Sequence, residues 1–167
     1  MKVQEIMTRE VGYCGPKASL ADVAKLMWDK DCGAIPVVDA ERKVIGMLTD
    51  RDICMAVATR NRLASEMQVG EVLSGTVVRA CAPSDDAEAA LDIMRQSRLR
   101  RLPVIGEDGT LQGILSITDL VLHTKGDGKK GDHLSRKRII GALKAICEPP
   151  AAELSKEKER ALGMASL

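Results

Sequence analysis

The chain has 167 residues and a formal net charge of +1, from 25 Lys and Arg against 24 Asp and Glu. Such an even balance provides no overall field that would draw the protein to nucleic acid or to an anionic membrane. One Trp, one Tyr and no Phe exclude single-strand nucleic-acid binding by stacked aromatic side chains, which needs several of them.

An internal duplication organises most of the chain. Residues 35–38, Ile-Pro-Val-Val, match residues 102–105, Leu-Pro-Val-Ile, at an offset of 67 positions. The same offset aligns residues 46–52, Gly-Met-Leu-Thr-Asp-Arg-Asp, with residues 113–119, Gly-Ile-Leu-Ser-Ile-Thr-Asp. A match at one offset over such a span indicates a repeated structural unit.

Each repeat is predicted to contain the same elements in the same order. In the first these are an extended segment at 11–14, an amphipathic helix around 20–27, strands at 35–39 and 44–48, and a helix from Thr49. In the second they are an extended segment at 77–81, a helix around 87–94, strands at 102–105 and 111–115, and a helix from Ser116. A unit of about 60 residues buries too little surface to be secure alone. We therefore expect an α+β fold in which two β-α-β-β-α units, at residues 2–60 and 68–123, pack about a pseudo-twofold axis.

The composition changes after residue 123. Residues 124–131 are rich in Gly, Lys and Asp and are predicted to form a flexible loop. Residues 132–148 can form a C-terminal helix with apolar side chains on one side and basic side chains on the other. Two prolines then open residues 149–167, which we expect to be a disordered tail. The helix either covers the core of its own module or docks on another protein, and the sequence leaves both open.

The residues with the clearest chemical meaning lie where the second strand of each repeat meets the following helix. A hydroxyl residue, Thr49 or Ser116, begins that helix, and an aspartate, Asp52 or Asp119, follows three positions later. The N-terminus of a helix offers unpaired N–H groups that suit a phosphate. An aspartate one turn into the helix can accept two hydrogen bonds from a ribose diol, as in dinucleotide-binding folds.

The same spacing has a purely structural interpretation. Ser/Thr-x-x-Asp before an apolar run is a capping-box pattern, which stabilises the start of any helix. Two copies at equivalent places, each preceded by a glycine and two apolar residues, favour the ligand-binding interpretation.

Residues 35–39, followed by residues 46–53, resemble a cystathionine-β-synthase-type (CBS) domain, and the second repeat resembles another. The resemblance covers residues 2–123. It implies a tandem CBS pair, or Bateman module, that binds AMP, ADP, ATP or S-adenosylmethionine in clefts between the repeats. It also implies a regulatory protein that signals to a separate partner and assembles as a homodimer.

The resemblance assigns site residues by position, with the aspartates on ribose and the hydroxyl residues near phosphate or ribose. These four residues are Thr49, Asp52, Ser116 and Asp119. Thr118 completes the Ser/Thr-x-Ser/Thr-Asp pattern of the family, whereas Arg51 replaces that hydroxyl in the first repeat and could contact phosphate through its guanidinium. The residues expected to line the adenine slots are Ala34, Ile35 and Pro36 with Tyr13, and Arg101, Leu102 and Pro103 with Ala80.

Other side chains have two interpretations each. Tyr13 is a candidate to stack on adenine, although a partly exposed strand tyrosine is the more ordinary explanation. Arg101 lies beside Pro103 at the expected slot, where it either contacts a phosphate or is simply solvated. Trp28 takes the place of Arg95 in the second repeat, and an indole at that position indicates either an interface, for example between protomers, or a tryptophan that is simply exposed.

The remaining features suit a protein of the cytoplasm. The N-terminus lacks the apolar segment of a signal peptide, and no apolar run approaches the ~18 residues of a membrane span. Five separated cysteines without a CxxC motif favour reduced, mostly structural thiols.

We find no nucleophile–base pair and no cluster of metal ligands, so we expect a sensor of an adenosine-containing ligand and not an enzyme. A dimeric interaction scaffold without a ligand is the alternative.

Overall fold

The computed structural model describes residues 1–73, 78–124 and 134–148. The first half of the chain holds α1 (Val3–Ile6), α2 (Leu20–Asp29), β1 (Ala34–Val38), β2 (Val44–Thr49), α3 (Asp50–Arg60), the 3-10 helix η1 (Ala64–Glu66) and α4 (Val69–Val72). The second half holds α5 (Ala87–Ser97), β3 (Arg101–Ile105), β4 (Leu111–Ser116), α6 (Ile117–Leu122) and α7 (Arg136–Cys147). Four predicted features lie outside the described residues: Val77, the loop over 125–131, the helix start at 132–133 and the tail over 149–167.

Each repeat contributes one antiparallel hairpin, and the two hairpins have the same register. Ala34 lies opposite Thr49 in the first ladder, and Arg101 lies opposite Ser116 in the second. Both ladders also shift register at the equivalent step near their tips. The duplication seen in the sequence therefore extends to the pairing of individual residues.

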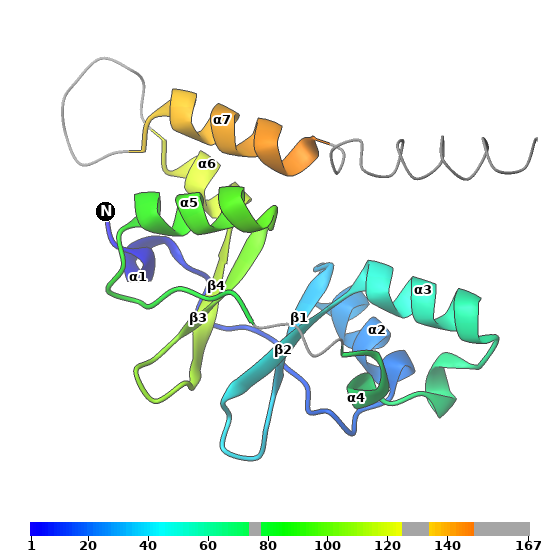
Figure 1. Cartoon of the computed structure of the whole chain (residues 1–167). Helices are drawn as coiled ribbons and strands as arrows, with labels where there is room; N and C mark the ends of the chain where they lie inside the picture. The colour runs from blue at the N-terminus through cyan, green and yellow to red at the C-terminus, as the bar shows by residue number, and fades with distance from the viewer. Residues whose placement is uncertain (74–77, 125–133, 149–167) are drawn as a thin grey trace, which may run out of the picture.

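The two hairpins lie side by side at the centre of the molecule, with the helices around them (Figure 1). Their tips are joined by backbone hydrogen bonds, from Val44 N to Gly109 O and from Leu111 N to Arg42 O, both at 3.2 Å. β2 of the first repeat also contacts β3 of the second. The hairpins thus hold the repeats together as an α+β pair.

The helix that follows each extended segment is amphipathic, as predicted. α2 buries Leu20, Val23 and Met27, and its start is capped by the side chain of Ser19. α5 buries the corresponding face, made by Ala87, Ala90, Leu91 and Met94. These apolar stripes pack against the hairpins of their own repeats and form the two cores.

The two cores exchange their leading segments. α1 precedes the first repeat but packs in the second core, where Val3 N donates to Asp85 O at 2.9 Å. α4 leads the second repeat but packs in the first core, where Val69 N donates to Ala18 O at 2.9 Å. Figure 1 shows α1 on the side of β3, β4 and α5, and α4 on the side of β1, β2 and α3. Because each repeat completes the core of the other, we expect neither to be stable alone.

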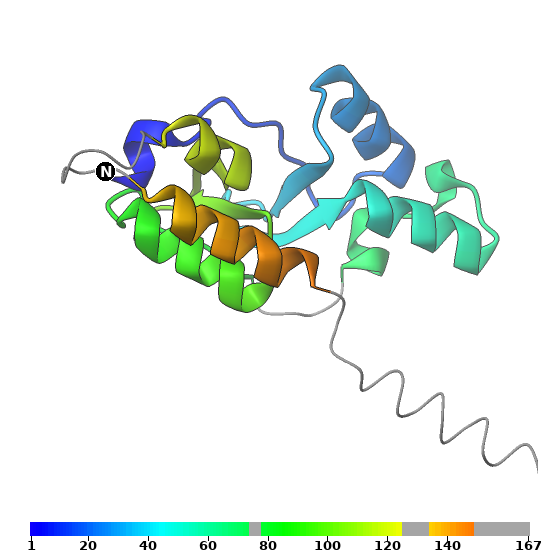
Figure 2. The same cartoon turned by 90° about the horizontal axis from the view of Figure 1, so that it is seen from above.

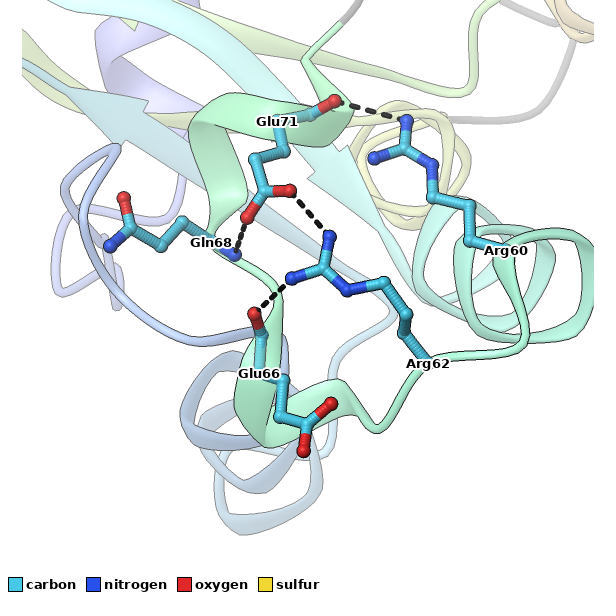
Figure 3. A network of polar contacts seen from close by, with 5 residues as sticks. All are labelled: Arg60, Arg62, Glu66, Gln68 and Glu71. Atoms are coloured by element: carbon cyan, nitrogen blue, oxygen red, sulfur yellow. Dashed lines mark hydrogen bonds and ion pairs between the residues drawn. The ribbon is translucent and has the colours of Figure 1, made fainter.

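A network of polar contacts fixes the connection between α3, η1 and α4 (Figure 3). Arg62 donates to the Glu71 carboxylate at 2.8 Å and to the Glu66 carbonyl, while Arg60 donates to the Glu71 carbonyl at 3.0 Å. Gln68 N also donates to the Glu71 carboxylate, at 2.8 Å. The bonds to its carboxylate, first from Gln68 N and then from Arg62, lower the pKa of Glu71. The network holds α4 in place over the first core.

α7 docks on its own module, which answers the question that the sequence left open. It lies along α5 in both views and also contacts α6 (Figures 1 and 2). Ile139 and Ala142 are buried in the second core. Arg138 forms ion pairs with Glu88 at 2.7 Å and Asp92 at 2.8 Å on α5. The described helix begins at Arg136, inside the predicted range of 132–148.

Candidate functional site

The predicted site lies where β2 runs directly into α3 and β4 runs directly into α6. In the first junction Asp52 Oδ2 accepts from Thr49 N at 2.9 Å and from Thr49 Oγ1 at 2.7 Å, and Thr49 Oγ1 accepts from Asp52 N at 3.2 Å. Ser116 and Asp119 repeat this pattern at 2.7, 2.7 and 3.2 Å. Both junctions are therefore capping boxes, so the structural interpretation of the motif is correct.

Each capping box uses only part of its carboxylate. All of the hydrogen bonds described for Asp52 and Asp119 involve Oδ2, and within the described part of the chain Oδ1 has no partner. Both aspartates are half-buried. A carboxylate can accept about four hydrogen bonds, so each retains capacity for a ligand hydroxyl while it caps its helix.

The hairpin register brings several predicted residues to these junctions. Ala34 lies opposite Thr49, and Arg101 lies opposite Ser116. The four neighbouring strand residues Ile35, Pro36, Leu102 and Pro103 are all buried. Their side chains belong to the hairpin interior, so only their backbone groups are suited to contact a ligand.

Two predicted residues project from the first turn of the helices. Arg51 and Thr118 occupy equivalent positions, one residue before each aspartate, and both are exposed. Each is therefore accessible to a ligand bound at its junction. This pair is also the clearest chemical difference between the two motifs, a guanidinium in one and a hydroxyl in the other.

Each extended segment runs beside the hairpin of its own repeat. It pairs with the hairpin through a single β-bridge and does not form a full strand. Cys14 pairs in parallel with Val37, and Cys81 pairs in the same way with Val104. These bridges place the preceding residues, Tyr13 and Ala80, next to the hairpins, where the adenine slots were predicted.

Tyr13 is 42% exposed. The guanidinium carbon of Arg42 lies over its ring, 4.7 Å from the centroid. A cation–π contact of this kind covers one face of the ring, so an adenine could stack only on the other face.

The glycine of each motif has a function that the sequence analysis did not assign. A Cβ on Gly113 would lie 2.5 Å from the carbonyl oxygen of Thr8, and a Cβ on Gly46 would lie 2.6 Å from Leu73 Cδ2. Thr8 pairs with Ile114 in β4, so the leading segment crosses the strand at this point. The Gly-apolar-apolar spacing before the hydroxyl residue was the available signal.

The electrostatic surroundings of the two junctions differ. Around Ser116 the chain carries Arg98, Arg100 and Arg101. The equivalent positions near Thr49 hold Asp31, Gly33 and Ala34. The helix of the first junction also opens with an acid, Asp50, where the second has Ile117. An anionic ligand group is therefore better accommodated at the second junction.

A cavity of about 490 Å³ lies between α2 and α3, and its lining reaches the first junction at Gly33 and Asp50. Its walls include Ala24, Met27 and Ile53, with Trp28 at its edge. None of the predicted ligand-binding residues lines it. The sequence indicated this surface only through Trp28, which is 86% exposed.

Two of the five thiols are buried within the repeats. Burial raises the pKa of Cys14 to about 11, and burial, with a smaller effect of the Asp85 charge, raises that of Cys81 to about 12. Both thiols therefore stay protonated and unreactive near neutral pH. Residues 1–73, 78–124 and 134–148 contain no cluster of three His, Cys, Asp or Glu that could hold a metal ion.

Comparison with known proteins identifies the class of protein that this fold and these junctions define. The family model for the CBS domain matches residues 3–59 and again residues 69–125. The chain therefore belongs to the CBS domain family and carries two copies of the domain. No helix in the described residues is long and apolar enough to cross a membrane.

Several relatives are similar in length to this chain. The CBS domain-containing protein YhcV of Bacillus subtilis is 33% identical over 133 residues, which cover 80% of this chain and 92% of YhcV. Hypoxic response protein 1 of Mycobacterium tuberculosis is 31% identical over 152 residues, which cover 89% of this chain and 95% of that protein. A crystal structure of CBSX2 in complex with AMP matches with a TM-score of 0.63 and 26% identity, over 72% of this chain and 93% of that chain.

Proposed function

We propose that this chain is a cytoplasmic regulatory module that binds an adenosine-containing ligand in clefts between its CBS repeats and signals to a separate protein. The observation that carries the proposal is the pair of matching strand–helix junctions, each with one carboxylate oxygen left outside its capping box. Membership of the CBS family and the AMP complex of CBSX2 support an adenosine-type ligand. AMP, ADP, ATP and S-adenosylmethionine are the candidates.

In this proposal the aspartate of each junction has two functions, one in stabilising the fold and one in binding the ligand. Oδ2 of Asp52 or Asp119 secures the helix start, and Oδ1 accepts a hydrogen bond from a ribose hydroxyl. Backbone groups of the adjacent hairpin edge, near Ala34 and Arg101, contact the adenine. Arg51 and Thr118 lie one residue before the aspartates and reach toward phosphate.

The second junction is the better site for a phosphorylated ligand. Arg101 lies opposite Ser116 and is partly exposed, and the neighbouring sequence is basic. The first junction has Asp50 at the helix start, followed by Arg51. We expect AMP or ATP to bind first through Asp119, with the Asp52 site weaker or selective for a ligand with less negative charge.

The exchanged segments suggest how binding could be transmitted. α1 and α4 each connect one repeat to the core of the other, so a change in the angle between the repeats must move both helices. A ligand that binds one relative orientation more tightly shifts the population toward it. A protein partner that recognises the same orientation then binds the liganded protein more tightly. The partner in turn raises the affinity for the ligand by the same factor.

Isothermal titration calorimetry with AMP, ATP and S-adenosylmethionine tests the proposal. Asp52→Ala and Asp119→Ala remove both the ribose contact and the capping box, so each needs a control that removes the cap alone. Thr49→Ala and Ser116→Ala come closest to this purpose, because they break the box and leave the carboxylate in place, while they also remove a hydroxyl that was predicted to lie near phosphate or ribose.

We expect Asp119→Ala to weaken AMP binding about tenfold or more, and Ser116→Ala to weaken it much less. Equal losses in the two variants would mean that the aspartate acts only through its cap. If none of the three compounds binds the wild-type protein, the alternative of an interaction scaffold without a ligand replaces the proposal.

A further inference from the structure

We propose that α7 regulates the second junction. While α7 is docked on α5 and α6, it holds that junction in the shape that binds the ligand, and its release lowers the affinity there and leaves the first junction unchanged. This inference rests on the proposed function, because it concerns the control of the same site. The signal to a partner protein is then the docking or the release of α7.

α7 packs against the two elements on either side of the second junction. One of them is α6, which begins after Ser116 and carries Asp119. Leu120, the next residue, is 0% exposed and lies in the same hydrophobic cluster as Ile139 and Ala142 of α7. The apolar side of α7 is therefore part of the core that supports the aspartate.

The other element is α5, along which α7 lies (Figure 2). Arg138 of α7 forms ion pairs with Glu88 and Asp92 on α5. After α5 the chain passes Arg100, whose carbonyl oxygen accepts from Ile117 N at 2.9 Å at the start of α6. Because α7 contacts α5 and α6 together, its docking restrains how the basic segment after α5 meets the helix start.

α6 needs this support more than α3 does. α6 spans only the six residues Ile117–Leu122, whereas α3 spans the eleven residues Asp50–Arg60. A helix of six residues is not stable on its own, so its position depends on packing. α3 is packed by α2 and α4 instead, and Arg60 and Arg62 bind α4 through Glu71. Release of α7 should therefore affect the second junction and spare the first.

α7 can leave the module without unfolding either repeat. It is the last described element, and its main contacts are with α5 and α6 and not with the hairpins. The side chains of its ion pairs are 37–48% exposed, and exposed pairs contribute about 0.2–1 kcal/mol each. Within α7, Ile139 and Ala142 are the buried residues. A contact of this size is one that the binding of a ligand can shift.

The coupling acts in both directions. If docked α7 raises the affinity for a ligand at Asp119, the ligand favours docked α7 by the same free energy. In the protein without ligand α7 is then released more often, and its apolar side, with Ile139 and Ala142, becomes accessible to a partner.

Isothermal titration calorimetry with AMP on Ala142→Glu and Gly141→Glu tests the proposal. Both variants add one negative charge to the same turn of α7. Ala142 is 0% exposed, so a glutamate there should release the helix. A Cβ on Gly141 would meet nothing within 4 Å, so Gly141→Glu is the matched control. We expect AMP to bind Ala142→Glu about fivefold or more weakly than the wild type, and Gly141→Glu as tightly as the wild type.

The same change in the Asp52→Ala and Asp119→Ala backgrounds identifies the junction that responds. With Asp52→Ala, AMP reports on the second junction, and its affinity should still fall in Ala142→Glu. With Asp119→Ala, the remaining binding is at the first junction and should be the same with or without Ala142→Glu. An equal loss in both backgrounds would show that Ala142→Glu only destabilises the whole protein, and would overturn the proposal.

Hydrogen exchange of the α7 amides measures docking itself. Exchange without ligand should be faster in Ala142→Glu than in Gly141→Glu, and AMP should slow it in the wild type. Arg138→Glu should act in the same direction by a smaller factor, and the addition of Glu88→Arg should recover part of the loss, since the pair is then restored with its charges reversed.

The outcomes separate this inference from the function on which it rests. A wild-type protein that binds AMP without any change in α7 exchange would overturn the coupling alone. A released α7 in Ala142→Glu with unchanged affinity for AMP would do the same. If the wild type binds none of AMP, ATP and S-adenosylmethionine, the proposed function fails and this inference fails with it.

Discussion

The two repeats share a framework and differ on their surfaces. Their hairpins have the same register, and their strand–helix junctions have the same hydrogen bonds to within 0.2 Å. By contrast, Trp28 is replaced by Arg95, Arg51 by Thr118, and the 11-residue helix α3 by the six-residue α6. The residues that maintain the fold, including both aspartates, therefore match in the two copies, while several exposed residues around them differ.

This contrast distinguishes two functions of the Thr49/Asp52 and Ser116/Asp119 pairs. As capping boxes they are equal, so their contribution to stability should be equal. As ligand sites they lie in different charge environments, so their affinities should differ.

Truncation of the equivalent core residues should destabilise the whole molecule. Ile35 and Leu102 are both 0% exposed, and replacing either by Ala should cost about 2–5 kcal/mol of unfolding free energy. Because α1 and α4 are exchanged between the cores, unfolding should remain a single transition. Urea denaturation of Leu102→Ala checks this: the accessibility of the buried Cys14 thiol of the first repeat to a thiol reagent should rise together with the loss of circular dichroism. Two separate transitions would show that the repeats unfold independently.

The motif glycines should differ in their tolerance of a methyl group. Gly113→Ala forces Cβ against the backbone of Thr8, which cannot move without breaking its pairing with β4, and should cost about 2 kcal/mol. Gly46→Ala meets only the end of the Leu73 side chain and should cost less than about 1 kcal/mol.

Gly141→Ala is the control for these glycine variants, measured by the same urea denaturation. It lies in α7 with open space around it, and Ala there should stabilise the helix by up to about 1 kcal/mol. Equal costs at Gly46 and Gly113 would contradict the difference between a backbone and a side-chain neighbour.

The two capping boxes should contribute equally. Thr49→Ala and Ser116→Ala each remove one cap with the same geometry and should each lower the unfolding free energy by about 1 kcal/mol. Thermal or urea denaturation without ligand measures both. Costs that differ by more than about 1 kcal/mol would mean that one junction has a further structural function.

The thiols should show the smallest and most local effect. At pH 8 a thiol reagent should modify the exposed Cys54 and Cys147 rapidly and leave Cys14 and Cys81 protected. Burial raises the folded pKa of the protected pair above that of an unfolded thiol. Protonated thiols therefore favour the folded state below about pH 9, and this stability declines as the pH rises toward 11–12. Rapid modification of all cysteines at pH 8 would contradict their burial.

The sequence predicted the fold well where its patterns were strong. The repeat at an offset of 67 identified both hairpins, and helical periodicity identified α2 and α5. α1, α4 and η1 were not predicted, because helices of three or four residues are too short to show a period. The exchange of leading segments was also missed, since it depends on tertiary packing that no local pattern encodes.

The sequence indicated candidate residues for a site, but not their geometry. The capping spacing indicated both uses of the aspartates, and only the structure shows that one oxygen of each is occupied by the cap. The sequence indicated Arg101 as either a phosphate contact or a solvated residue, whereas the contrast between the basic second repeat and Asp31 and Asp50 of the first requires the two junctions to be compared. The cavity beside Trp28 could not be predicted, because it depends on the packing angle between two helices.

The most direct test of the central claim compares AMP with 2′-deoxy-AMP on the wild type and on Asp119→Ala. If the aspartate reads the ribose, the wild-type protein should prefer AMP by about tenfold or more. The variant should bind the two nucleotides with the same Kd, because the partner of the 2′-hydroxyl is gone. A preference of equal size in both proteins, or none in the wild type, would show that this carboxylate only caps its helix.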